Sequence, residues 1–249
     1  MKKTILLLCG GQSGEHQVSL RSGLSVFDAL PTDHYDVVFV GVDHDGTWLT
    51  GTPLIQFPDD PKEIRLAANL QRAHWTKNTL NGQVIDCVFS VLHGQFGEDG
   101  CMQGALEMAR LPYVGSGVLG SAIAMDKDIT KRLALQAGVK TAPYLLIRHS
   151  DALRPTYAEA ANQLGSTLFV KPAAQGSSLG ISKVTNEAAY LKALEFAFQY
   201  DHKVIVEKAI QGREIEIAVL GNNNPIVSQP GEVIPFEEFY RNFLRPGRW

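Results

Sequence analysis

One short stretch of the chain carries residue types suited to binding a polyphosphate. Residues 167–184 read TLFVKPAAQGSSLGISKV, an apolar run that ends in Lys171 and proline, followed by small residues with Ser177 and Ser178 between two glycines. Glycines let the backbone approach a ligand, while amide N–H groups, hydroxyls and an ammonium group favour phosphate oxygens. The Gly-x4-Gly-Lys-Ser/Thr spacing of a Walker loop is absent. On the loop alone, a flexible hairpin with a solvated lysine stays an alternative.

A second polar turn follows the first apolar run of the chain. Residues 5–8 are apolar, and residues 9–16 read CGGQSGEH. The glycines do not match the Gly-x-Gly-x-x-Gly fingerprint of dinucleotide-binding turns, and the carboxylate of Glu15 would repel a pyrophosphate. A carboxylate at this turn suits a cationic group such as a substrate ammonium. It could equally complement the N-terminus of the following helix.

A third polar segment lies at the end of another predicted strand. Residues 86–92 read as a strand, and HGQFGEDG follows at residues 93–100. Open α/β sheets place ligands just beyond the carboxyl ends of their strands. His93 taken alone is an ordinary strand-end histidine, but an expected sheet edge shared with Glu15 favours a ligand role.

Alternating strand and helix patterns would position these groups. Between the predicted strands at residues 5–8 and 35–42, apolar residues recur with helical spacing, so the chain is expected to open with a parallel α/β domain. From Ser121 a second helix is predicted, with Ser121 as its cap and Gly138 as its stop. This helix would carry Lys127, and Lys131 one turn later.

Composition limits the classes of partner. The chain has 249 residues, with 23 basic and 26 acidic side chains and a net charge of −3, so no basic excess indicates nucleic acid. The odd count of three cysteines fits a reducing cytoplasm. The apolar run at residues 5–8 is shorter than the roughly 7–15 residues of a signal peptide, and no run approaches the roughly 20 of a membrane span. We therefore expect a cytoplasmic protein without nucleic-acid or membrane partners.

Taken together, the motifs resemble those of D-alanine–D-alanine ligases of the ATP-grasp superfamily. Five blocks occur in family order: GGQSGEH at 10–16 with VS at 18–19, HG at 93–94 with GEDG at 97–100 and QG at 103–104, MDK at 125–127, FVKP at 169–172 with GSS at 176–178, and Glu207 with RE at 213–214. One block would be weak evidence, whereas five in order over roughly residues 4–240 are specific.

The resemblance implies a fold and a reaction. The fold would be α/β, with a Rossmann-like N-terminal domain at residues 1–120, a central ATP-grasp subdomain at 121–207, and the start of an incomplete C-terminal ATP-grasp subdomain at 208–249. The reaction would be ATP-dependent joining of two D-alanines, through D-alanyl phosphate, for peptidoglycan synthesis. Two alternatives stay open: another ATP-grasp ligase, such as a D-alanine–D-lactate ligase, and a non-catalytic remnant that binds nucleotide or D-alanine. A homodimer is a further open alternative.

The same resemblance implies roles for single residues. Glu15 would bind the ammonium group of the first D-alanine, His93 would lie beside that substrate, and Ser177 would help to hold Glu15, which makes Glu15 and Ser177 the catalytic candidates. Contacts with ATP are expected from the phosphate side (Lys127, Lys171, Ser177 and Ser178), the adenine side (Glu207 and the backbone of Lys208 and Ile210) and the ribose (Glu214).

The C-terminal tail departs from the family pattern. After Tyr240 the chain reads RNFLRPGRW, with three arginines and no carboxylate. The family continues instead with an Asp, a Glu and an Asn that bind magnesium, a cation that prefers carboxylate oxygens. Mg²⁺ is expected with the ATP of the family, yet we assign no metal ligand to this chain. The departure predicts a C-terminally truncated chain, for which inactivity is an open alternative.

Overall fold

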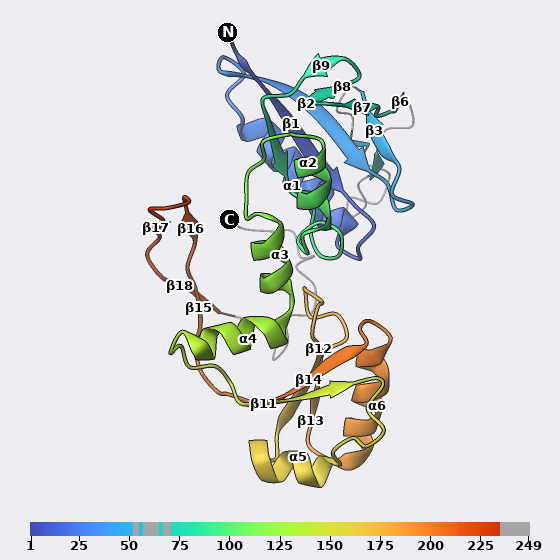
Figure 1. Cartoon of the computed structure of the whole chain (residues 1–249), viewed down its shortest axis with the longest axis vertical. Coiled ribbons are helices and arrows are strands. Elements are labelled where there is room, and N and C mark those ends of the chain that lie inside the picture. The colour runs from blue at the N-terminus through green and yellow to red at the C-terminus, as the bar shows by residue number, and fades with distance from the viewer. Residues whose placement is uncertain (52–54, 57–64, 67–70, 235–249) are drawn as a thin grey trace.

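The structure, a computed structural model, describes residues 1–51, 55–56, 65–66 and 71–234. Figure 1 shows two units at opposite ends of the molecule, with helix α3 (Val118–Met125) running from the first toward the second. Helix α4 (Lys127–Gln136) follows at the near end of the second unit, and residues 214–233 extend away from that unit as an arm. Within the described residues, no helix has the length and apolar character needed to cross a membrane.

The first unit is built on a mixed sheet. Strand β1 pairs in parallel with its two neighbours, and antiparallel strands extend the sheet on one side. The strand order is β10 (Cys87–Ser90), β1 (Lys3–Gly10), β2 (Tyr35–Val42), β3 (Trp48–Thr50) and β6 (Gln71–Arg72). Short strands complete the described part of this unit: β4 (Ile55–Gln56), β5 (Arg65–Leu66), β7 (Trp75–Thr76), β8 (Thr79–Leu80) and β9 (Gln83–Val84).

Helices cover both faces of this sheet. Alternate residues of a strand point to opposite faces, so Leu6 and Leu8 pack with the cluster that includes Met102 and Leu106 of α2 (Cys101–Met108). Leu7 packs on the other face, with residues of α1 (His16–Ala29). A parallel strand buried on both faces needs a continuous apolar run, which residues 5–8 supply. The predicted parallel α/β opening is confirmed.

The predicted single helix from Ser121 is wrong. The chain forms two helices that break at Asp126, where the backbone is extended with ψ at 103°. The Asp126 carboxylate accepts the N–H groups of Asp128 at 3.0 Å and Ile129 at 3.1 Å, so it caps α4. Ser121 is buried inside α3 and donates to the Ser116 carbonyl at 3.3 Å. Apolar spacing continues across the break, which is why periodicity alone does not reveal it.

The second unit is a four-stranded antiparallel sheet with helices on one face. Its order is β11 (Tyr144–Arg148), β14 (Lys203–Lys208), β12 (Leu168–Pro172) and β13 (Ser182–Val184). Alternate apolar residues of these strands pack against α5 (Tyr157–Leu164) and α6 (Glu187–Phe198). Thr156 caps α5 in a capping box with Glu159, and Asn186 caps α6. The hairpin predicted around Ser177 is present, since Leu168 pairs with Val184.

The opposite face of this sheet is charged and meets α4. Lys171 of β12 and Lys203 and Glu207 of β14 alternate with the buried valines, and so point away from α5 and α6. Lys203 pairs with Asp126, the cap of α4, and its Nζ lies 3.5 Å from Asp128 Oδ2. These ion pairs dock α4 on the sheet beside the polar loop.

Beyond β14 the described chain forms two exposed antiparallel pairs. They are β15 (Glu214–Glu216) with β18 (Gly231–Val233), and β16 (Val219–Leu220) with β17 (Ile226–Val227). The expectations about the tail after Tyr240 concern residues outside the described part of the chain. The predicted division at residues 120 and 207 stays a prediction.

Candidate active site

The Glu15 carboxylate lies where loops from both units meet. Ser177 donates its hydroxyl to Glu15 Oε1, which links the loop after β12 to the turn after β1. Gly94, in the loop after β10, lies so near that a Cβ added there would come within 2.6 Å of Glu15 Oε2. Glu15 occupies the N-cap position of α1 but makes no side-chain capping hydrogen bond. The helix-complementing alternative for Glu15 therefore receives no support from a capping contact.

Ser177 and Ser178 hold the polar loop in an unusual backbone conformation. Their φ angles are +45° and +59°, both in the left-handed region. This region is unfavourable for residues other than glycine by about 1–2 kcal/mol each, so neighbouring contacts must compensate. The Ser177–Glu15 hydrogen bond is one such contact. Successive amide groups in such a turn can converge on an anion.

His93 sits beside Glu15 with both ring nitrogens near polar partners. Nε2 lies 3.2 Å from the Ser22 hydroxyl, and Nδ1 lies 4.0 Å from Glu98 Oε1. The interaction with Glu98 raises the pKa of His93, although partial burial works in the opposite direction. Ser13 donates to the His93 carbonyl at 2.7 Å, so the turn that carries Glu15 also fixes the histidine backbone.

Lys127 connects α4 to the polar loop. Its ammonium group donates to the carbonyls of Pro172 at 3.3 Å and Ala173 at 3.4 Å, and to that of Gln175. Burial lowers the pKa of Lys127, and the neighbouring charge of Lys171 lowers it further. The hydrogen-bond partners of this ammonium group are neutral carbonyls, which do not neutralise its positive charge. The charge can therefore interact with an anionic ligand.

Glu207 joins the lysines of the strand and the helix. Its two carboxylate oxygens pair with Lys171 of β12 and with Lys131 of α4. Burial works to raise the pKa of Glu207, but the two lysines outweigh it and lower that pKa. Lys127 interacts electrostatically with both Lys171 and Glu207, so the three lysines and this carboxylate form one charged cluster.

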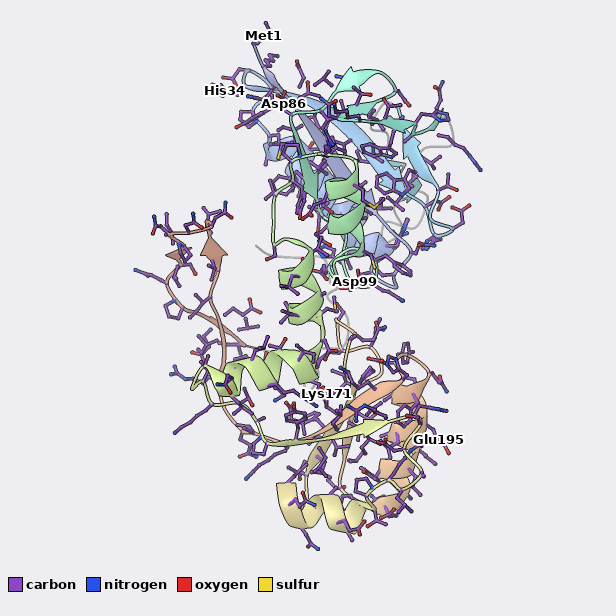
Figure 2. All side chains as sticks on the ribbon, viewed as in Figure 1. Met1, His34, Asp86, Asp99, Lys171 and Glu195 are labelled. Carbon is purple, nitrogen blue, oxygen red and sulfur yellow. The ribbon has the colours of Figure 1, made fainter. Side chains whose placement is uncertain are left out.

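The structure brings some of the predicted site residues together and leaves others apart. Glu15, His93 and Ser177 form one group, and Lys127 joins it through the loop of residues 172–178. In Figure 2, Lys171 lies at the edge of the second unit that faces Asp99 of the first. The predicted adenine and ribose contacts Lys208, Ile210 and Glu214 lie at or beyond the end of β14, and their side chains are exposed. No described contact joins these three residues to the lysine cluster. Ser178 belongs to the polar loop.

Lys131 is a site residue that sequence analysis placed on the helix without a role. The signal that could have found it is its spacing, because residues four apart share one helix face and Lys127 already pointed to phosphate. The sequence gives no sign of its partner Glu207, which lies 76 positions later in the chain.

Among the residues that the structure describes, this cluster coincides neither with a metal site nor with the cavity in the first unit. Among the described residues, no group of three or more His, Cys, Asp or Glu side chains could hold a metal ion. The absence of metal ligands from the whole chain stays a prediction. A cavity of about 740 Å³ lies in the first unit, beside Trp48, Trp75 and Leu106, away from Glu15. The site is therefore defined by converging charges and contacts rather than by volume.

Known proteins of one family match this chain over nearly its whole length. Two family models match, described as "D-ala D-ala ligase N-terminus" over residues 4–116 and "D-ala D-ala ligase C-terminus" over residues 133–243. The D-alanine–D-alanine ligases A of Salmonella typhimurium and Escherichia coli K12 are each 44% identical over 252 residues, covering 96% of this chain and 69% of the relative.

Solved structures give the same result. The D-alanine–D-alanine ligase of Coxiella burnetii is similar with a TM-score of 0.83 and 35% identity, covering 94% of this chain and 71% of that one. The VanG D-Ala:D-Ser ligase of Enterococcus faecalis has a TM-score of 0.78 and 31% identity, covering 99% of this chain and 74% of that one. The α/β fold class expected from the sequence is confirmed. The chain belongs to the D-alanine–D-alanine ligase family.

Proposed function

We propose that this protein joins two D-alanines to D-alanyl-D-alanine with ATP, for peptidoglycan synthesis. The observation that carries the proposal is the Ser177–Glu15 hydrogen bond, which joins a loop suited to phosphate with an acidic turn suited to an ammonium group. The lysine cluster next to that loop supplies the positive charge that a triphosphate needs. Relatives named D-alanine–D-alanine ligase support the same reaction.

In the first step, a carboxylate oxygen of one D-alanine attacks the γ-phosphorus of ATP. The bond from that phosphorus to the bridging oxygen of ADP breaks, giving D-alanyl phosphate and ADP. Catalysis of such a transfer consists largely of positioning and charge neutralisation. We assign these tasks to Lys127, Lys171 and the amide groups around Ser177 and Ser178.

In the second step, the neutral amine of another D-alanine attacks the acyl carbon of D-alanyl phosphate. The bond from that carbon to the phosphate oxygen breaks, inorganic phosphate leaves, and the nitrogen loses one proton to give the amide. Glu15 holds the ammonium group of the first D-alanine, and this contact directs the carboxylate of that D-alanine at the phosphate loop for the first step. Ser177 keeps Glu15 in place, and His93 lies beside the same substrate. Glu98 raises the pKa of His93, so the imidazole is protonated more readily. A protonated imidazole suits a position next to a substrate carboxylate.

The remaining nucleotide contacts are proposed on the family pattern. Glu207 and the backbone of Lys208 to Ile210 would meet the adenine, and Glu214 the ribose. Glu207 lies on the same sheet face as Lys171, which supports its part of this assignment. The run α3–α4 between the two units supports a domain boundary near residue 120. A cytoplasmic location is proposed because ATP is the substrate.

Mg²⁺ would accompany the nucleotide and neutralise phosphate charge when bound. The described residues near Lys171 offer ammonium groups and one carboxylate, Glu207, which is already paired, and this donor set does not suit a magnesium ion. No step proposed for this chain therefore depends on a metal ligand of its own.

The test is product formation by the purified chain. Phosphate release from ATP is measured with D-alanine alone and with D-lactate or D-serine added, and the products are identified by mass spectrometry. D-alanyl-D-alanine as the main product supports the proposal. A depsipeptide or a D-alanyl-D-serine product would reassign the second substrate, while nucleotide binding without product would indicate a non-catalytic binding protein.

A further inference from the structure

Lys131 occupies a position that the proposed chemistry does not yet use. It lies one turn after Lys127 on α4, with its side chain 13% exposed. Its ammonium group pairs with Glu207 Oε1, donates to the Ala142 carbonyl at 3.0 Å, and lies 5.3 Å from the centre of the Tyr144 ring. These contacts direct the charge of Lys131 at Glu207 and away from the polar loop.

Glu207 is shared between two lysines of different character. Residue 207 pairs across the strands with Phe169, so Lys171, two residues further along β12, is its diagonal neighbour on the same face. Lys131 reaches the other oxygen from the helix above. The Glu207 side chain is only 10% exposed, so its charge depends on these neighbours for compensation.

Phosphate binding by Lys171 changes this balance. An ammonium group that turns to a phosphate gives up part of its interaction with the carboxylate. A buried carboxylate without a cation is strongly unfavourable, because burial removes the water that would otherwise solvate it. Without a second lysine, Glu207 would therefore retain Lys171 and oppose nucleotide binding.

We propose that Lys131 is a positioning residue for nucleotide binding, which keeps Glu207 compensated and in place while Lys171 turns to phosphate. The inference rests on the proposed function only for the identity of the ligand, ATP. Lys131 acts through Glu207 and does not contact the nucleotide. Its contribution thus depends on the negative charge of Glu207.

The first experiment measures MgATP affinity by calorimetry for the wild-type protein and for Lys131→Met. The variant is expected to bind about tenfold more weakly, as for loss of one charge-assisted interaction. Lys131→Arg should restore most of the affinity, and Lys140→Met, at an exposed lysine just beyond α4, should leave it unchanged. Affinity in Lys131→Met equal to wild type overturns the inference.

The second experiment separates an action through Glu207 from direct contact with the nucleotide. In a double-mutant cycle with Glu207→Gln, the effect of Lys131→Met on affinity should shrink to about twofold or less, because no buried charge is left to compensate. An undiminished effect in the Glu207→Gln background would show direct contact and overturn the inference.

Two controls keep these outcomes distinct. Thermal unfolding checks that each variant is folded at the assay temperature. Should Lys131→Met unfold there, Lys131→Gln, which retains a donor for the Ala142 carbonyl, carries the same expectation. Absence of MgATP binding by the wild-type protein would refute the proposed function itself, whereas wild-type binding with an unaffected Lys131 variant refutes only the role of Lys131.

Discussion

Replacing Gly94 by alanine should impair binding of the amino acid far more than folding. Gly94 has φ at +68°, and a Cβ there would lie 2.6 Å from Glu15 Oε2 and 3.2 Å from Ser13 Cβ. The Glu15 carboxylate would have to retreat by about 0.8 Å to reach ordinary van der Waals contact. Such a shift moves it away from the Ser177 hydroxyl and from the proposed ammonium position.

Two contributions to the expected magnitude can be separated. The left-handed backbone makes alanine unfavourable by about 1 kcal/mol, an effect on folding. Loss of one charge-assisted hydrogen bond between Glu15 and the substrate corresponds to about 1.5–3 kcal/mol, or roughly a 10- to 100-fold rise in KM for D-alanine. The KM for ATP should change less than the KM for D-alanine, because the phosphate loop keeps its contacts with Lys127 when Glu15 shifts.

Gly82 provides a matched control for the backbone contribution. Its φ is +83°, yet a Cβ there would meet nothing within 4 Å. Gly82→Ala should therefore lower the free energy of unfolding by a similar amount and leave the KM for D-alanine unchanged. Urea unfolding and steady-state kinetics with D-alanine and ATP varied in turn measure both quantities. A KM for D-alanine in Gly94→Ala within twofold of that in Gly82→Ala would refute the placement of Glu15 at the substrate.

Three further perturbations test other parts of the structure. Lys171→Met should weaken MgATP binding at least about tenfold and also reduce the free energy of unfolding by about 1.5–3 kcal/mol, because buried Glu207 loses a partner; calorimetry and urea unfolding check both, and unchanged affinity would contradict the phosphate role. Asp126→Ala removes the cap of α4 and the partner of Lys203, so urea unfolding should show a loss of at least about 1 kcal/mol, and a neutral result would contradict the docking of α4. Burial lowers the pKa of His16 in the folded protein below its ordinary value of 6.5. Between the lowered pKa and 6.5 the unfolded chain binds more protons than the folded protein, so the free energy of unfolding falls as pH drops below 6.5. His16→Gln should show a smaller loss of urea midpoint between pH 7.5 and 5.5, whereas equal losses would exclude His16 as the cause.

Local sequence signals predicted the elements that carry the site. The apolar run before Lys171, the proline and the Gly/Ser segment define a strand and a turn whose geometry is set within about 18 residues, and the hairpin is present. The apolar run at residues 5–8 similarly predicted a central strand, because a parallel strand buried on both faces is continuously apolar. The resemblance then ordered these pieces into one family.

Other features required contacts between distant parts of the chain. The break at Asp126 was missed because the helical spacing of apolar residues continues through it, and the cap is fixed by Lys203 on another strand. The same holds for Lys131, whose role depends on Glu207 across the helix–sheet interface. Local helix and strand propensities do not predict either of these ion pairs, Asp126 with Lys203 and Lys131 with Glu207.

The sequence by itself determined which residue types were available for phosphate and ammonium chemistry and which strands and turns would present them. Periodicity, turn residues and motif spacing act over a few residues, and each of these choices is local. Only the tertiary structure decided that Ser177 meets Glu15, that Gly94 limits the space beside that carboxylate, and that Lys131 shares Glu207 with Lys171. These juxtapositions follow from sheet register and from the docking of α4, which depend on burial and charge compensation over the whole fold.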